Sequence, residues 1–259
     1  LIVSSVREDN CPECKIPTYP TDVLRTHERV AGSQENVTAL NILMGVVEHL
    51  VLAALVKSLS NNHDRLDRTA IVKDGPLSQF DTAAWIHDPI LEMIEDVQGS
   101  HLSQGGAPFV VTGVHKTGKF ASFAEEIKGR KAGPWLLELP NDIVYKYISA
   151  GDRTEPFGKK TYYGKNFIYR SENRSNNAHC FAFTVPRNYG DRDSKEELRA
   201  DQEYYPELAR TITVLDKLRT IRYENGLIPL VVAHDQASLP EELSDKILGE
   251  LTTFISKAQ

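Results

Sequence analysis

Cysteine is scarce in this chain, which has only Cys11, Cys14 and Cys180 among 259 residues. An odd and low cysteine count argues against a secreted domain that is held together by disulfides. Cys11 and Cys14 form half of a zinc-ribbon motif, but a structural zinc site needs four ligands. Completing such a site with Cys180 and a His would depend on the tertiary structure.

Long hydrophobic runs are also missing. The longest apolar stretch, residues 40–59, is interrupted by Glu48, His49 and Lys57. It therefore falls short of the roughly 18–20 uninterrupted apolar residues that span a bilayer. The N-terminus lacks the basic region and long apolar region of a signal peptide. These absences predict a cytoplasmic protein that does not contact membranes.

Positive charge is not in excess, because 30 Lys and Arg residues face 36 Asp and Glu residues and the net charge is −6. The whole chain thus gives no basic signature for nucleic acid. A nuclease remains compatible with this balance, because its metal site needs carboxylates and its DNA track can be local. The chain has neither a Walker A motif nor a Gly-x-Gly-x-x-Gly motif, so any use of ATP must belong to a partner.

The elements that the pattern does predict mix helices and strands, which indicates an α/β class. Helices are expected over 36–59, 88–98, 120–128, 142–148, 195–223 and 233–257, and strands over 69–73, 109–114, 162–169 and 180–185. Residues 1–35 read as an irregular, turn-rich segment, expected to continue from residues upstream of Leu1. Residues 36–259 show no internal boundary and are expected to form one domain.

The first of these helices is expected to bury one broad apolar face. At about 100° per residue, that face contains Leu40, Leu43, Met44, Val47, Leu50, Val51, Ala54 and Leu55. Glu48 then lies at the rim of the apolar face, from which it can reach into a site between helix and sheet. His49 is expected to point the opposite way.

Two carboxylates are candidates for a metal site. Asp74 ends a predicted strand and precedes Gly75, so it is expected to be exposed at the edge of a sheet. Oxygen ligands of this kind suit Mg²⁺ and Mn²⁺, and Glu48 could supply a second. The alternatives are an ordinary Asp-Gly turn and a solvated helix Glu.

His234 and Lys116 are further candidates, each with a plain structural alternative. His234 follows an apolar stretch near a predicted helix, and imidazole can bind Mn²⁺ beside carboxylates. It could also be merely structural or exposed. Lys116 follows a predicted strand and could neutralise charge on a phosphate, or simply be a solvated strand end.

The order of four short motifs along residues 36–250 resembles the NurA nuclease family. In chain order they are Val46-Val47-Glu48, Ile71-Val72-Lys73-Asp74-Gly75-Pro76-Leu77, Val111-Thr112-Gly113-Val114-His115-Lys116-Thr117 and Pro229-Leu230-Val231-Val232-Ala233-His234. The family places a helical Glu before a strand ending in Asp-Gly-Ser-Leu. A strand ending near a Lys follows, and an Ala-His pair comes close to the C-terminus.

The resemblance implies an RNase H-like mixed sheet flanked by helices and a divalent-metal-dependent DNA nuclease, cutting as an exonuclease or an endonuclease. Glu48 and Asp74 would be ligands of Mn²⁺ or Mg²⁺, His234 a ligand or proton-transfer group, and Lys116 a contact to the phosphate. A two-metal site, with the ions about 3.5–4 Å apart, suits phosphodiester hydrolysis. The implied assembly is a homodimer with a HerA-like hexameric ATPase that translocates DNA, in DNA repair by end processing or in phage defence.

Two positions depart from the family pattern. The family has another Asp in an Asp-Gly motif on its first strand, whereas Asp9 and Asp22 lie too close to Glu48 and lack a following Gly. The family's Tyr, eight positions before the His, is Gly226 here. Either the first strand lies upstream of Leu1, or the chain is a catalytically inactive adaptor that binds DNA and the translocase.

A basic tract between residues 159 and 174 is the candidate DNA-binding surface. It contains Lys159, Lys160, Lys165, Arg170 and Arg174, interleaved with Tyr162, Tyr163, Phe167 and Tyr169. Basic side chains can contact phosphates while aromatic rings stack on splayed bases. The alternative is an amphipathic hairpin with a solvated face and its aromatic side chains in the core.

Overall fold

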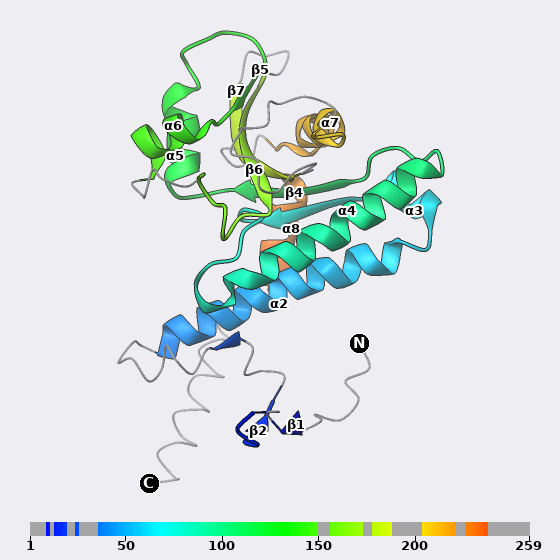
Figure 1. Cartoon of the computed structure of the whole chain (residues 1–259). Coiled ribbons are helices and arrows are strands. Elements are labelled where there is room, and N and C mark those ends of the chain that lie inside the picture. The colour runs from blue at the N-terminus through cyan, green and yellow to red at the C-terminus, as the bar shows by residue number, and fades with distance from the viewer. Residues whose placement is uncertain are drawn as a thin grey trace.

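A five-stranded mixed sheet forms the centre of the computed structural model (Figure 1). The structure describes residues 9–10, 13–19, 24–25, 36–149, 156–172, 178–187, 204–220 and 226–237. The strands of the sheet are β3 (Ala70–Asp74), β4 (Val110–His115), β5 (Trp135–Glu138), β6 (Gly164–Glu172) and β7 (Ala178–Pro186). Their spatial order is β3-β4-β7-β6-β5, with β3 and β4 parallel and the other pairs antiparallel.

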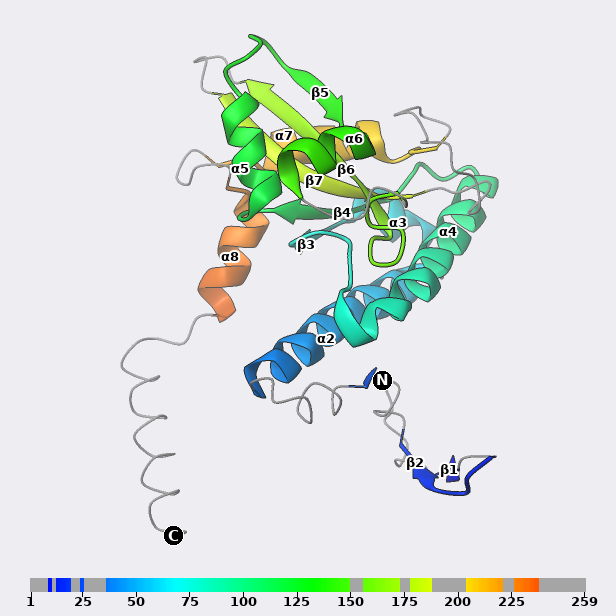
Figure 2. The same cartoon turned by 60° about the vertical axis from the view of Figure 1, so that its left-hand side comes forward.

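Helices pack around this sheet and against each other. They are α2 (Asn36–Leu59), α3 (His63–Arg68), α4 (His87–Ser103), α5 (Lys119–Ile127), α6 (Asn141–Ile143), α7 (Leu208–Leu218) and α8 (Ile228–Ala237), with the 3-10 helix η2 (Asp81–Ile86) and the π-helical turn η3 (Val144–Ile148). Figure 2 shows α5 and α6 beside the β5–β7 part of the sheet, and α2 with α4 below it. The expected α/β class with a mixed sheet flanked by helices is confirmed at this level.

Alternation along the long hairpin β6–β7 explains why helices cover both faces of the sheet. Phe167 and Phe183 belong to a core cluster with Leu208 and Leu215 of α7. Side chains one position away, such as Ile168, belong instead to a cluster with α5 and α6. Since successive strand residues point to opposite faces, the consecutive apolar residues Phe167, Ile168 and Tyr169 require cover on both sides of the sheet.

The face of α2 that is buried differs from the expected one. The core includes Ile42, Val46, His49, Leu52 and Val56. Side chains of the predicted face are instead 42% to 60% exposed, namely Leu40, Leu43, Met44, Val47, Leu50, Val51 and Leu55. The helix is apolar over most of its circumference, so periodicity alone could not select the face that packs against α4 and η2.

His49 is buried in the core, where one ring nitrogen and the ring itself have partners, while its Nε2 has no hydrogen-bond partner among the described residues. Its Nδ1 lies 2.7 Å from the carbonyl oxygen of Gly45, one helical turn earlier. Its ring packs edge-on against Tyr163, with centroids 5.6 Å apart. Burial lowers the pKa of His49 below its ordinary value, which keeps the imidazole neutral.

By length and composition α2 could cross a membrane, and it is the one described helix that could. In the structure, however, one of its faces is part of the core cluster that also holds α4 and η2. The described residues thus form an α/β domain in which α2 is a structural element. Its opposite face is left as an exposed apolar surface.

Several element boundaries differ from expectation. The helix expected over 195–223 is observed only as α7, because residues 204–207 form a turn and 188–203 lie outside the described residues. The last helix begins at Ile228, earlier than expected, and its predicted continuation beyond Ala237 also lies outside them. The helix expected over 88–98 is observed as the longer α4, which follows η2 without a break and continues to Ser103.

Two strand pairs were missed by the sequence analysis. The short β5 pairs with β6 at the edge of the sheet. In the segment expected to be irregular, β1 (Asp9–Asn10) pairs with β2 (Pro17–Thr18). Elements of two to four residues are too short for hydrophobic periodicity to reveal them.

Candidate functional site

Asp74 is the last residue of β3, where the backbone turns away from the sheet. Gly75 follows with a φ of +83°, a left-handed conformation that favours glycine. Gly113 on the neighbouring β4 lets this loop approach, because a Cβ there would lie 2.5 Å from the carbonyl oxygen of Gly75. The sequence Asp-Gly-Pro-Leu therefore ends the strand and leaves the Asp74 carboxylate at the sheet edge.

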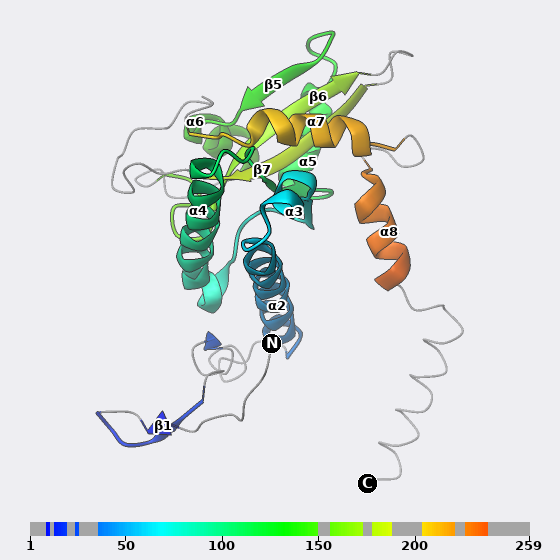
Figure 3. The same cartoon turned by 90° about the vertical axis from the view of Figure 1, so that its right-hand side faces the viewer.

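Two donors from distant parts of the chain meet on this carboxylate. Lys116, just beyond the end of β4, places its Nζ 3.0 Å from Asp74 Oδ2. His234 of α8 places its Nε2 2.9 Å from the same oxygen. A carboxylate only accepts, so His234 Nε2 carries the proton in this contact. Figure 3 shows α8 (orange) at the side of the molecule, and this helix contacts β3.

Glu48 is connected to this group through a lysine that the sequence analysis did not single out. Lys73 Nζ lies 3.4 Å from Glu48 Oε2 and donates to the backbone carbonyl of Asp74 at 2.8 Å. Lys73 itself is largely buried, so its ammonium group is held between α2 and the end of β3. We call Glu48, Lys73, Asp74, Lys116 and His234 the strand-end cluster.

Of the four residues that were expected to form the site, Asp74, Lys116 and His234 meet directly, whereas Glu48 reaches the end of β3 only through Lys73. The side chains of Glu48, Asp74 and His234 are 57%, 46% and 64% exposed, so each can be reached from solvent. Their donor set is two carboxylates and one imidazole. Within the described ranges, however, no three His, Cys, Asp or Glu side chains are already grouped as metal ligands.

His115 adds a neutral imidazole next to the strand-end cluster. Its Nε2 lies 2.9 Å from Asn166 Oδ1, and its ring stacks on Phe120. Burial is the main reason that its pKa falls to about 4, and the hydrogen bond to Asn166 only partly opposes it. His115 therefore stays uncharged at neutral pH and adds no positive charge beside Lys116.

A signal for Lys73 was present in the sequence but ambiguous. A Lys inside an otherwise apolar strand has to find an anionic partner if its charge is buried. The sequence does not say which of 36 acidic residues that partner is. Only the packing of α2 against the strand end identifies Glu48.

The basic tract is not the continuous surface that was expected. Lys165 and Arg170 are buried, with Lys165 3.5 Å from Glu138 and Arg170 bound to Glu172 and to backbone carbonyls. The interleaved aromatic side chains are buried as well, namely Tyr162, Tyr163, Phe167 and Tyr169. Lys159 and Lys160 are exposed, and Arg174 lies outside the described residues.

The geometry of β6 explains this difference. It is an inner strand with both faces covered, so its Lys and Arg side chains extend to acidic partners and carbonyl groups instead of solvent. The aromatic side chains lie in the core, as the alternative of an amphipathic hairpin expected, but the solvated face of that alternative is not observed, because both faces of the hairpin are buried.

The cysteines do not come together in the described part of the chain. Cys14 is exposed in the N-terminal hairpin, whereas Cys180 is buried in β7. Burial raises the pKa of the Cys180 thiol to about 12, so it stays protonated and is a poor metal ligand. Cys11 lies outside the described residues.

Comparison with known proteins identifies no relative of this chain. The chain matches no protein-family model, no curated protein and no solved structure.

Proposed function

We propose that the protein is a divalent-metal-dependent DNA nuclease whose reaction site is the strand-end cluster. The observation that carries the proposal is that Lys116 and His234 both contact one oxygen of Asp74. Glu48 is connected to this group through its ion pair with Lys73. These residues come from four separate parts of the chain. Surface salt bridges contribute little to stability, so stability is a weak reason for such convergence.

The donor set fits a hard divalent cation. Mg²⁺ commonly keeps several waters and is held by one or two carboxylates together with substrate phosphates. Glu48 and Asp74 would supply those carboxylates, and His234 a nitrogen ligand that suits Mn²⁺. Such an ion, when bound, activates water and polarises the phosphorus–oxygen bond.

The chain's own residues have complementary tasks in this proposal. Lys116 is 27% exposed, so its ammonium group can leave Asp74 and contact a phosphate oxygen. The His234 side chain is exposed, so its Nε2 is accessible to hold or transfer a proton at the site. Lys73 is too buried to reach substrate and instead positions Glu48 and the end of β3.

The wider resemblance to the NurA family extends the proposal to an RNase H-like arrangement, a homodimer and a HerA-like translocase in the cytoplasm. The mixed sheet with a carboxylate at the end of a strand is compatible with that arrangement. The exposed apolar face of α2 supports a protein partner in general, because apolar patches of this extent mark interaction surfaces.

A catalytically inactive adaptor is the second candidate. The observation that favours it is that each acidic residue of the strand-end cluster is already neutralised by a lysine. Ion pairs of this kind form without any metal, and they leave neither carboxylate of the cluster without a cationic partner. Under this alternative the protein binds DNA and its partner but cuts nothing.

Cleavage of labelled single-stranded and double-stranded DNA by the full-length protein separates the two candidates. We expect cleavage with Mn²⁺ or Mg²⁺, none with EDTA, and a loss of at least about 100-fold in rate for Glu48→Gln. Asp88→Asn is the matched control, because Asp88 is as exposed as Glu48 and lies beside His87, outside the cluster. Metal-independent cutting, or full activity of Glu48→Gln, would contradict the proposed site.

A further inference from the structure

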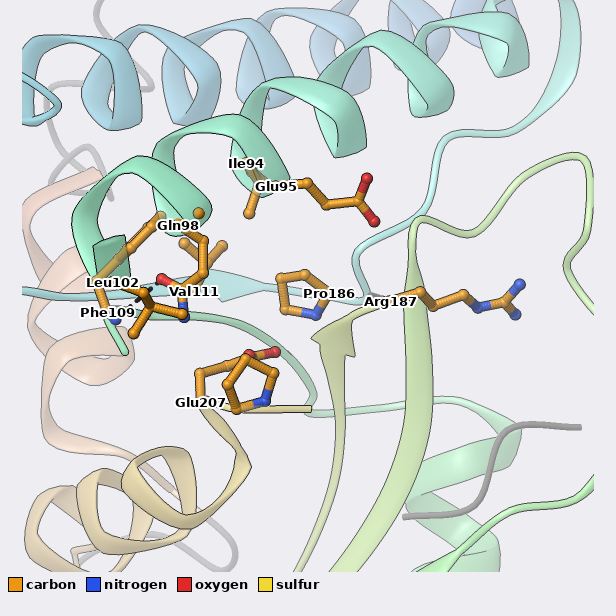
Figure 4. A pocket seen from close by; sticks show the side chains of 11 residues that line it. Ile94, Glu95, Gln98, Leu102, Phe109, Val111, Pro186, Arg187 and Glu207 are labelled. Atoms are coloured by element: carbon orange, nitrogen blue, oxygen red, sulfur yellow. Dashed lines mark hydrogen bonds between the residues drawn. The ribbon is translucent and has the colours of Figure 1, made fainter. Parts of the chain in front are cut away.

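A cavity of about 150 Å³ lies between α4, the start of β4, the end of β7 and the turn at 204–207 (Figure 4). Its walls are mostly apolar and include Ile94, Leu102, Phe109, Val111, Pro186 and Pro206. Cavities of about this volume in other proteins accommodate a single six-membered ring. None of the lining residues belongs to the strand-end cluster.

Glu207 is the unusual member of the wall. It precedes α7 in the position of a helix cap, yet its side chain makes no capping hydrogen bond. The side chain is only 5% exposed, and its Oε1 has no hydrogen-bond partner within the described residues. Burial raises the pKa of this carboxyl to about 8, so it is mostly protonated at neutral pH.

Gln98 provides a second polar group on the opposite wall. Its Oε1 accepts a hydrogen bond from the backbone N–H of Phe109 at 3.1 Å, which fixes the orientation of the amide. Its Nε2 is buried and finds no partner in the part of the chain that the structure describes. A buried polar atom without a partner destabilises the folded protein, and Gln98 Nε2 and Glu207 Oε1 are both atoms of this kind in the cavity wall.

The two charged residues Glu95 and Arg187 also line the cavity but do not satisfy these atoms. In Figure 4 the end groups of Glu95 and Arg187 point away from the cavity centre. Arg187 uses its Nη2 to donate to the carbonyl oxygen of Phe157 at 3.2 Å. The interior therefore presents an amide donor from Gln98 and a carboxyl group from Glu207 among apolar walls.

We propose that this cavity binds a small neutral heterocycle of one ring, whose polar edge offers an acceptor to Gln98 Nε2 and a donor to Glu207 Oε1. The apolar walls would contact the two faces of the ring. A neutral ligand fits better than an ammonium, because the walls are apolar and Glu207 is held uncharged. This binding does not depend on the nuclease activity proposed above.

Titration with 2-pyridone tests the proposal, since its ring carries a carbonyl acceptor next to an N–H donor. We expect saturable binding to the full-length protein at roughly millimolar concentration, followed by NMR and by the rise in melting temperature. Toluene serves as a probe of shape alone, and benzylamine as a cationic probe of similar size.

Substitutions of Glu207 separate recognition from packing. Glu207→Leu removes a buried polar group without a partner, so we expect the free protein to melt at a higher temperature. The same variant should bind 2-pyridone at least about tenfold more weakly. Glu207→Gln keeps a polar atom in place and should bind within about threefold of wild type. Glu95→Gln, at the rim, should change nothing.

Each other outcome would overturn the proposal. If toluene binds as well as 2-pyridone in every variant, the polar edge is not recognised. If benzylamine binds more tightly, the ligand is a cation. If no probe saturates the wild-type protein, the cavity holds water only.

Discussion

The charges around Asp74 allow the effect of Asp74→Asn to be worked out with its sign. The substitution keeps the shape of the side chain and removes an anion that faces Lys116 and His234 at 3.0 and 2.9 Å. All three side chains are substantially exposed, so solvent screens these pairs and each contributes about 0–1 kcal/mol. Without metal, the variant should therefore be slightly less stable than wild type, by about 1 kcal/mol.

Divalent metal should widen this difference in stability. If Asp74 is a ligand, a metal concentration of 100 times the dissociation constant stabilises the wild-type protein by about 2.7 kcal/mol. In a protein of this size, about 1 kcal/mol corresponds to roughly 2–4 °C in melting temperature. Wild type should then gain about 5–10 °C with Mn²⁺, whereas Asp74→Asn should gain close to nothing.

Differential scanning calorimetry with Mn²⁺, with Mg²⁺ and with EDTA measures both effects, and the DNA cleavage assay follows the same samples. Asp88→Asn again serves as control and should keep the full metal response. A wild-type protein whose melting temperature ignores saturating metal would refute the reasoning. So would an Asp74→Asn protein that cuts DNA at the wild-type rate.

Three further predictions concern the core and the buried titratable groups. Leu52→Ala should lower the free energy of unfolding, measured in urea, by about 2–5 kcal/mol. Leu50→Ala, on the exposed face of α2, should change it by about 0.5 kcal/mol or less. A larger loss for Leu50→Ala than for Leu52→Ala would contradict the observed buried face. Because the folded pKa of Glu207 is raised to about 8, its stabilising contribution is full below the ordinary pKa of Glu and is lost as the pH rises through about 8. The free energy of unfolding should therefore fall by up to roughly 1.4 kcal/mol per pH unit between about pH 5 and 8, and Glu207→Gln should remove this slope. An unchanged slope in the variant would contradict the assignment of the raised pKa to Glu207. The Cys180 thiol should resist alkylation until the protein unfolds, whereas Cys14 should react at once. Peptide mass spectrometry measures both rates, and early labelling of Cys180 would disprove its burial.

The sequence by itself determined the class of the fold and most of its elements. The apolar runs around Phe167 and Phe183 predicted two strands, and the strand-breaking residues Gly75 and Pro76 predicted where β3 ends. These predictions succeed because strand alternation, glycine conformation and helix periodicity are local properties of the backbone. The resemblance of the motifs also pointed to Glu48, Asp74, Lys116 and His234, and their role as one site remains a prediction.

Tertiary structure decided which side chains are accessible. The exposed face of α2 and the buried Lys165 and Arg170 both contradict what hydrophobicity and charge along the chain suggested. An apolar helix buries whichever face its neighbours α4 and η2 cover, and a basic side chain on an inner strand is buried with its acidic partner. Neither choice is encoded near the residue itself.

The same reason applies to the residues that carry chemistry. Lys73 joins Glu48 to Asp74 only because α2 packs beside the end of β3, and Glu207 faces Gln98 only because the turn before α7 packs against α4. Contacts between residues separated by tens or hundreds of positions depend on how the elements are packed. The sequence could therefore name the candidate side chains, while only the packing of α2, α7 and α8 against the sheet and α4 decided which of them meet.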